Sequence, residues 1–331
     1  MNRANSLTMG MDDVAAMAQI DIPSLQGKVS DEEWAIRVDL AAAYRMVAHY
    51  GWDDIIFTHL SARIPGPEHH FLLNPYQLMF EEVTASSLVK VDIHGNPVEP
   101  TPFITNPAGF VIHSAVHMAR DDAMAVMHLH TPHGQATSAH EEGLLPLTQT
   151  AMLVRDEVAY HDFEGVAVDA DERERLVADL GDKRAMLLRN HGTLALGRTV
   201  GEAFLTLYFL ERACEAQVMA LTAGDALNRP PQGSLEVTAE QGKAGLMITA
   251  NLLAWPALKR KAYRLDPSFA TKCGFRSKRI RELAPGFCFT AFSELPGDST
   301  RLEIALEQIP LRLHRIGCSR FLIERDFRVS E

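Results

Sequence analysis

The chain has 331 residues, of which 47% are hydrophobic and 23% charged, an ordinary balance for a globular protein with one large domain or two modest ones. Its net charge of −11 is unevenly distributed: residues 1–258 hold 17 Lys and Arg against 34 Asp and Glu, and residues 259–331 hold 15 against 9. The acidic body argues against a nucleic-acid partner, because phosphate binding needs clustered cations.

Nothing in the sequence predicts a membrane partner or a disulfide framework. The apolar runs are much shorter than the roughly 20 residues of a bilayer span, and the N-terminus lacks the apolar core of a signal peptide. The cysteines are widely scattered and form no Cys-x-x-Cys pair, so free thiols are expected. They are Cys214, Cys273, Cys288 and Cys318. We therefore expect a cytoplasmic protein.

The first half of the chain is expected to pair one long helix with short strands. Ser30 and Glu33 fit a capping box that opens a helix over residues 31–50, and Gly51 can take the left-handed conformation that ends it. Pro-Gly and His-Gly-Asn turns then separate short apolar runs. These runs predict strands at residues 55–63, 71–74 and 88–93, followed by a helix at 108–120.

In the second half, strands and helices alternate. Apolar runs predict strands at residues 123–130, 144–154, 166–169 and 184–190. Thr199 and Glu202 form a second capping box before a helix that runs to about residue 224. Residues 225–237 are expected to form a linker, and a last helix at 238–263 is expected to be weakened at Pro256. The pattern predicts an α/β fold in which helices cover both faces of a mixed sheet.

Two histidines close the predicted strand at 123–130. Because side chains alternate along a strand, His128 and His130 point to the same face. His191 follows a second apolar run, and Gly192 is expected to let the backbone turn sharply after it. Three imidazoles at neighbouring strand ends leave a coordination position open, as in catalytic zinc sites. The alternative is an ordinary polar loop after a buried strand.

Seven short segments together resemble one protein family in order and spacing. They are Gly51-Trp52 and residues 58–63 (THLSAR), 82–91 (EVTASSLVKV), 106–110 (NPAGF), 128–132 (HLHTP), 157–162 (EVAYHD) and 189–192 (RNHG). These segments resemble the class II aldolase/adducin family, and most of all its adducin-like branch. The resemblance implies a three-layer αβα sandwich with a central, mainly antiparallel sheet. It also implies a homo-oligomer, by analogy a cyclic tetramer, that acts on a small-molecule substrate.

The resemblance further implies a divalent metal, Zn²⁺ before other ions. The histidines that hold it in the aldolases match His128, His130 and His191. The glutamate that moves the proton in the aldolases falls at Gly109 here, and glycine cannot transfer a proton. The aldolases' Gly-Asn phosphate cradle is replaced by Thr58-His59. A sugar-phosphate aldolase is therefore not expected, and Gly109→Glu is expected to restore some aldol-type proton transfer.

The remaining histidines supply candidates for proton transfer. His113 and His117 stand four apart on one helix face, and His133 follows the ligand strand; the alternative for each is packing against the sheet or exposure to solvent. Candidate substrate-binding residues are Thr58, His59, Asn106 and Gly109. We expect a lyase that stabilises an enolate through the metal during retro-aldol cleavage or decarboxylation of a small carbonyl or hydroxy-acid substrate. The alternative is a non-catalytic, adducin-like module for binding or oligomerisation.

The chain is expected to have four regions. They are an N-terminal arm (1–29), the class II aldolase/adducin domain (30–225), a linker with a C-terminal helix (226–270) and a basic tail (271–331). The tail has no counterpart in the resemblance and holds three of the four cysteines. It is either an extension, from read-through or a frame change, that never acquired a fold, or a small basic subdomain.

Overall fold

A seven-stranded sheet lies in the first of two units into which the chain divides, Met1–Phe275 and Arg276–Glu331. Its strand order is β3-β2-β1-β4-β7-β6-β5, and neighbouring strands are antiparallel except β5 and β6, which are parallel. The strands are β1 (His59–Arg63), β2 (Phe71–Leu73), β3 (Val89–Val91), β4 (Ala125–Leu129), β5 (Val158–His161), β6 (Ala185–Leu188) and β7 (Gly192–Gly197).

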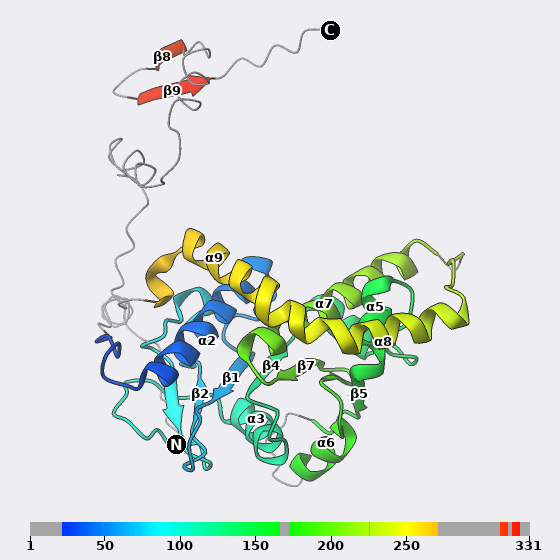
Figure 1. Ribbon diagram of the computed structural model, residues 1–331, viewed down its shortest axis with the longest axis horizontal. Coiled ribbons are helices and arrows are strands. Elements are labelled where there is room, and N and C mark those ends of the chain that lie inside the picture. The colour runs from blue at the N-terminus through cyan, green and yellow to red at the C-terminus, as the bar shows by residue number, and fades with distance from the viewer. Residues whose placement is uncertain (1–21, 166–171, 225, 271–311, 317–319, 325–331) are drawn as a thin grey trace, which may run out of the picture. The chain divides into compact units, whose positions relative to one another are not determined.

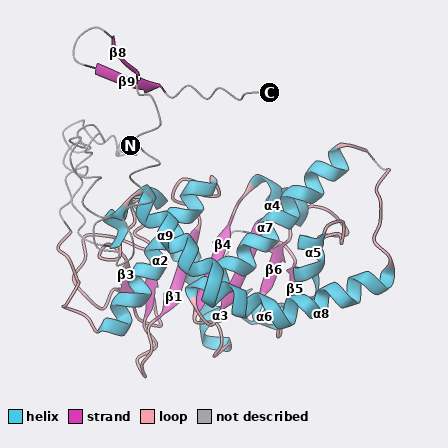
Figure 2. Cartoon of the chain, turned by 45° about the horizontal axis from the view of Figure 1, so that its top comes forward, coloured by secondary structure: helices cyan, strands magenta, loops and turns pink. Residues whose placement is uncertain are grey.

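Helices cover both faces of this sheet (Figures 1 and 2). The helices α2 (Asp31–Tyr50) and α7 (Val200–Thr222) pack on one face, and α3 (Pro107–Ala119) and α6 (Glu172–Leu180) pack on the other. The expected three-layer αβα sandwich with a mainly antiparallel sheet is therefore confirmed. The other helices are α4 (Pro132–Ser138), α5 (Gln149–Val154), α8 (Gln232–Thr249) and α9 (Trp255–Leu265), with single turns η1 (Phe80–Glu82), η2 (Arg155–Glu157), η3 (Ala250–Ala254) and η4 (Pro267–Ala270).

The computed structural model describes residues 22–165, 172–224, 226–270, 312–316 and 320–324. The strand expected at 166–169, most of the expected arm and tail, and the cysteines at 273, 288 and 318 lie outside these residues. In the second unit, β8 (Arg312–Ile316) and β9 (Arg320–Glu324) pair as an antiparallel hairpin. Within the described ranges, no helix has both the length and the apolar character needed to cross a membrane.

The alternation of side chains along β4 divides them between two cores. Met127 and Leu129 belong to the core that includes α2 and α7, whereas Val126 belongs to the core that includes α3 and α6. His128 has the same parity as Val126, so its imidazole faces the α3 side of the sheet. A register slip of one residue would put a leucine where the imidazole stands.

Capping side chains begin the two longest helices at the expected positions. Ser30 Oγ accepts a hydrogen bond from Glu33 N at 3.1 Å, and Gly51 ends α2 with a φ of 67°. Thr199 Oγ1 accepts from Glu202 N at 3.1 Å and begins α7. The Glu33 carboxylate binds two neighbouring cationic side chains and returns no bond to its cap. The caps are therefore confirmed, but the box at Ser30 is only half formed. In the second box the Glu202 carboxylate accepts from Arg198 N, one residue before the cap.

Some elements of the structure differ from the predicted ones. Residues 149–154 form helix α5 instead of a strand, because Thr148 Oγ1 accepts from Ala151 N and starts a helical turn. Strand β7 was not expected, since the glycine that begins it suggested a turn. The linker ends at residue 231, where α8 follows. The expected weakening of the last helix at Pro256 is confirmed, because the π-helical turn η3 interrupts the helix just before that proline.

A buried carboxylate ties α7 to the ends of β4 and β7. Glu211 is 2% exposed and accepts hydrogen bonds from the hydroxyls of Thr131 and Thr193. Burial raises the pKa of Glu211 to about 7, although the two hydroxyl groups act in the opposite direction. The fold therefore favours the neutral acid, which it buries at lower cost than the carboxylate.

This pKa makes stability depend on pH. An ordinary glutamate has a pKa of 4.5, so the folded chain binds the proton more tightly than the unfolded chain. The resulting stabilisation is complete below pH 4.5 and is lost as the pH rises through 7. We predict that the free energy of unfolding of the wild-type protein falls by about 3 kcal/mol relative to Glu211→Gln across this interval. Urea denaturation at pH 4.5 and 8 measures the difference, and parallel pH profiles would contradict the prediction.

Candidate functional site

Three imidazoles meet where β4, β6 and β7 come together. His128 Nε2 lies 2.9 Å from His130 Nε2, and His130 Nε2 lies 2.9 Å from His191 Nε2. One ring nitrogen from each residue falls within 4.8 Å of the other two. His128 is buried, and the other two residues are partly exposed. The fold therefore brings the three histidines singled out in the sequence to one point.

The turn between β6 and β7 sets the position of His191. Asn190 adopts a left-handed φ of 56°, and His191 N donates to Leu188 O at 3.0 Å. Gly192 does not have a positive φ, so it is not the flexible turn residue that the sequence suggested. A Cβ at this position would lie 2.3 Å from Leu129 O. Glycine is needed here because β4 and β7 approach closely, which keeps the turn next to the end of β4.

Hydrogen bonds at the Nδ1 atoms decide which ring nitrogens face the centre. His128 Nδ1 lies 2.9 Å from Thr193 O, and His130 Nδ1 lies 3.0 Å from Asp54 Oδ2. Both partners are acceptors, so each Nδ1 carries the proton and each Nε2 presents a lone pair. Two lone pairs facing each other at 2.9 Å repel unless a cation joins them. This set of nitrogen donors, held by a carboxylate and a carbonyl, fits a divalent metal such as Zn²⁺.

A proton is a poor substitute for that cation. Burial holds the pKa of His128 well below its ordinary value of 6.5, and the neighbouring histidines act in the same direction. Burial also lowers the pKa of His191 to about 4. Both rings are therefore neutral at pH 7, the state in which imidazole binds metal ions.

A cavity of about 410 Å³ opens beside the three imidazoles. Besides these rings, it is lined by polar and apolar groups in similar number: Asp54, His59, Tyr76 and Asn106, and Phe57, Ile112, Phe163 and Gly165. Among the described residues that line it, none is Lys or Arg. The cavity thus offers room and hydrogen-bonding groups for a small polar molecule, but no cationic side chain for a phosphate.

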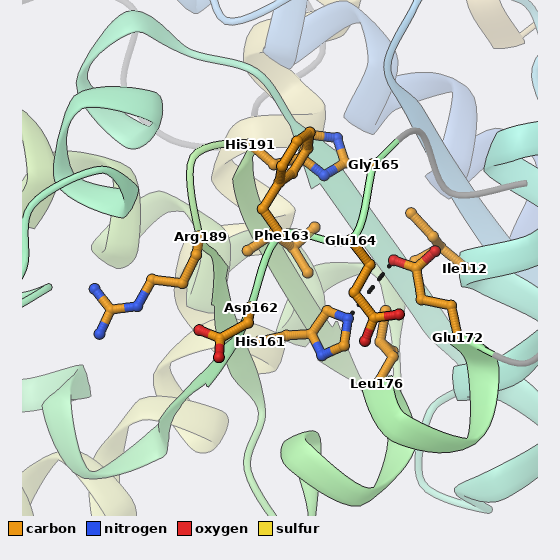
Figure 3. Close-up of a pocket in the computed structure, with 11 residues that line it drawn as sticks. Ile112, His161, Asp162, Phe163, Glu164, Gly165, Glu172, Leu176, Arg189 and His191 are labelled. Atoms are coloured by element: carbon orange, nitrogen blue, oxygen red, sulfur yellow. Dashed lines mark ion pairs between the residues drawn. The ribbon is translucent and has the colours of Figure 1, made fainter. Parts of the chain in front are cut away.

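A second, much smaller cavity of about 10 Å³ adjoins the first (Figure 3). His161 and Glu172 point toward each other across it, with 3.6 Å between His161 Nε2 and Glu172 Oε1. His161 Nδ1 lies 2.7 Å from Asp179 Oδ2, which anchors the ring. The two cavities share Ile112, Phe163, Gly165 and His191. The smaller one has room for about one water molecule and not for a substrate.

The candidates His113 and His117 belong to a buried chain of hydrogen bonds behind His59. His59 Nδ1 lies 2.8 Å from His113 Nε2, and Ser61 Oγ lies 2.5 Å from His113 Nδ1 and 2.7 Å from His117 Nε2. The chain ends at Ala123 O, which lies 2.6 Å from His117 Nδ1. The four side chains are at most 3% exposed. Both helix histidines pack against the sheet, and of these groups His59 is the one that lines the cavity.

The other predicted site residues lie in different places. Asn106 lines the cavity. Thr58 is buried, and its Oγ1 has no hydrogen-bond partner among the described residues. His133 lies in the first turn of α4, outside the described cavity lining. A substrate-binding role for Thr58 and a catalytic role for His133 stay predictions.

Gly109 lies directly against the ring of His59. A Cβ on this glycine would fall 2.4 Å from His59 Cδ2 and 2.7 Å from His59 Nε2. A glutamate at position 109 therefore has no room while the imidazole keeps its place. This contact opposes the expectation that Gly109→Glu restores proton transfer, which stays a prediction.

Two residues that shape the site were not singled out in the sequence. Asp54 precedes β1 and holds His130, 76 positions away, and nothing in the spacing of the chain indicates that contact. Ser61 could have been found, because alternation along β1 places it on the same face as His59. Ser61 is also the residue that joins the two helix histidines to the strand.

Comparisons with known proteins show the family of the chain. The model of the family described as "Class II Aldolase and Adducin N-terminal domain" matches residues 38–218. A Caulobacter vibrioides protein whose name provisionally assigns it to aldolase class 2 is 59% identical over 249 residues, which cover 75% of this chain and 96% of that protein. Alpha-adducin from Mus musculus is 44% identical over 194 residues, which cover 58% of this chain and 26% of that protein.

A solved structure from the same family shares the fold. The crystal structure of an aldolase II superfamily protein from Pseudomonas syringae aligns with a TM-score of 0.71 and 49% sequence identity. The alignment covers 75% of this chain and all of that one (100%). On the family match, the sequence identity and the shared fold, the chain belongs to the class II aldolase and adducin family.

Proposed function

We propose that this protein is a metal-dependent lyase that cleaves a carbon–carbon bond of a small carbonyl or hydroxy-acid substrate, by retro-aldol cleavage or decarboxylation. His128, His130 and His191 would hold the metal, with Zn²⁺ as the first candidate. The observation that carries the proposal is that three ring nitrogens converge beside a cavity of about 410 Å³. By analogy with the family, we also propose a cytoplasmic homo-oligomer, tetrameric in form.

The roles of the chain's own residues follow from their contacts. When bound, the metal supplies a Lewis acid that draws electron density from a carbonyl oxygen and favours an enolate. Asp54 and the Thr193 carbonyl keep two imidazoles turned toward that ion. Phe57 and Phe163 add apolar surface to the cavity lining, and we infer that Tyr76 donates its hydroxyl to the substrate. These groups orient a small molecule at the metal without enclosing it completely.

The lining also supports a substrate class. A phosphate ester carries about two negative charges, and proteins usually meet them with cationic side chains or a nest of backbone N–H groups. The described lining has no Lys or Arg and includes the carboxylate of Asp54. We therefore infer that the substrate lacks a phosphate.

A non-catalytic module is the second candidate, because the chain is 44% identical to alpha-adducin over 194 residues. Such a module has no use for unprotonated ring nitrogens that face one another. Holding them together without a metal costs free energy, since buried polar groups are stabilised only when they are paired. The convergence of the imidazoles therefore favours the lyase.

Removal of one ligand tests the metal site. We predict that His128→Ala and His191→Ala each lower zinc affinity by at least about tenfold. Loss of a residue that only supports a metal ligand typically lowers affinity about 10- to 100-fold, and loss of the ligand itself costs at least as much. His94→Ala is the matched control, since His94 is exposed and lies in the turn after β3, distant in the sequence from the three ligands. Elemental analysis after dialysis measures the metal, and a screen of 2-oxo and hydroxy acids measures turnover. Metal retained by both variants would refute the site. A wild-type protein that binds metal but turns over none of these compounds would favour the binding module.

The absence of a cationic side chain from the described lining gives a separate prediction. Zinc-loaded protein should bind dihydroxyacetone at least as tightly as dihydroxyacetone phosphate, because the added charge meets no Lys or Arg in that lining. Isothermal titration calorimetry compares the two compounds. Binding of the phosphate ester that is tenfold tighter would contradict the inferred substrate class.

A further inference from the structure

The hydrogen bonds of the buried chain behind His59 can all form in one donor-to-acceptor direction only. Ala123 O can only accept, so His117 Nδ1 donates to it. A neutral imidazole has one N–H, and His117 Nε2 must therefore accept from the hydroxyl of Ser61. That hydroxyl has no second proton, so Ser61 Oγ accepts from His113 Nδ1. The direction of three successive hydrogen bonds thus follows from one backbone carbonyl.

The next hydrogen bond of the chain reaches the cavity. Because His113 Nδ1 carries the proton, His113 Nε2 accepts, and His59 Nδ1 must donate to it. His59 Nε2 is then left with a lone pair. Among the described residues no group forms a hydrogen bond with this atom, and the ring lines the cavity. The lone pair is therefore available to a ligand.

Burial keeps His113 and His117 neutral. Removal from water holds the pKa of His113 well below the ordinary value of 6.5. It lowers the pKa of His117 to about 3, and the nearby Arg63 acts in the same direction. A second proton on His113 would put its Nε2–H against the Nδ1–H of His59, whereas His59 lines the cavity and can gain a proton at Nε2 without breaking the chain.

We propose that His117, Ser61 and His113 form a positioning relay that holds His59 as the Nδ1–H tautomer, with its Nε2 as the acceptor for a hydroxyl group of the substrate. The tautomer follows from the hydrogen bonds alone, whereas the substrate contact rests on the proposed function. Gly109 supports the same arrangement by leaving room for the His59 ring, which a Cβ at position 109 would displace. The substrate class narrows to compounds that carry a hydroxyl on the carbon β to the carbonyl or carboxyl group.

This acceptor has a place in retro-aldol cleavage. His59 Nε2 takes the hydroxyl proton, the carbon–oxygen bond becomes a carbonyl, and the electron pair of the broken carbon–carbon bond passes to the adjoining carbonyl as an enolate. Return of the same proton to the enolate carbon releases the second product and restores His59. Atoms and charge balance, and no oxidant or reductant is needed.

The tautomers can be read directly by NMR of protein labelled with ¹⁵N-histidine. We expect His59, His113 and His117 each to show a protonated Nδ1 and an unprotonated Nε2 in the wild-type protein, with or without zinc. Ser61→Ala should disturb the signals of His113 and His59, because His113 Nδ1 loses its acceptor. Ser114→Ala is the matched control. Like Ser61, Ser114 is buried, but it lies on α3 and its hydroxyl donates to Val111 O. A proton on His59 Nε2 in the wild-type protein would overturn the relay, whatever the variants do.

The contact with a hydroxyl is tested with 3-hydroxypropionate and propionate, which differ in that group alone. Calorimetry on zinc-loaded protein should show that His59→Phe, which keeps a ring against Gly109, weakens 3-hydroxypropionate binding about tenfold. Propionate binding should change less than twofold, and zinc content should be the same. Equal effects on both acids would refute the hydroxyl contact. Loss of zinc binding from the wild-type protein would instead refute the proposed function, while the NMR result would still decide the relay.

Discussion

The antiparallel register of β1, β4 and β7 is the constraint on which the site depends. It places His59 opposite His128, and His128 opposite Leu194. Alternation then turns both imidazoles toward α3, while Thr193 turns its side chain toward α7 and its carbonyl toward His128. A shift of one residue in either pairing would exchange the faces of the strand. The three-histidine centre and the chain behind His59 would be lost together.

Both outer layers of the sandwich support that register with polar contacts. From the α7 side, Glu211 joins Thr131, which follows the ligand strand, to Thr193 on β7. From the α3 side, two histidines reach through Ser61 to the ring that lines the cavity. Buried polar groups are costly unless they are fully paired, and these networks are paired along their length. Polar residues at the centre of the fold therefore serve to position the site as well as to fill space.

The sequence shows a large part of this arrangement, and the gaps have physical reasons. Caps such as Ser30 are local, so the helix they begin could be placed. The His-x-His pair could be placed because alternation is a property of one strand. The helix at 149–154 could not, since a short apolar run fits a strand or a helix equally well. Asp54 and the relay depend on contacts between distant segments, and the role of Gly192 appears only once Leu129 is beside it.

The central claim is that three imidazole nitrogens share one metal ion. X-ray absorption spectroscopy at the zinc edge, on zinc-loaded wild-type protein, tests it most directly because the spectrum reports the atoms around the ion. We expect the scattering pattern of three imidazole rings, with oxygen supplying the rest of the coordination. A spectrum with sulfur ligands, or with fewer than three imidazoles, would rule out the three-histidine centre.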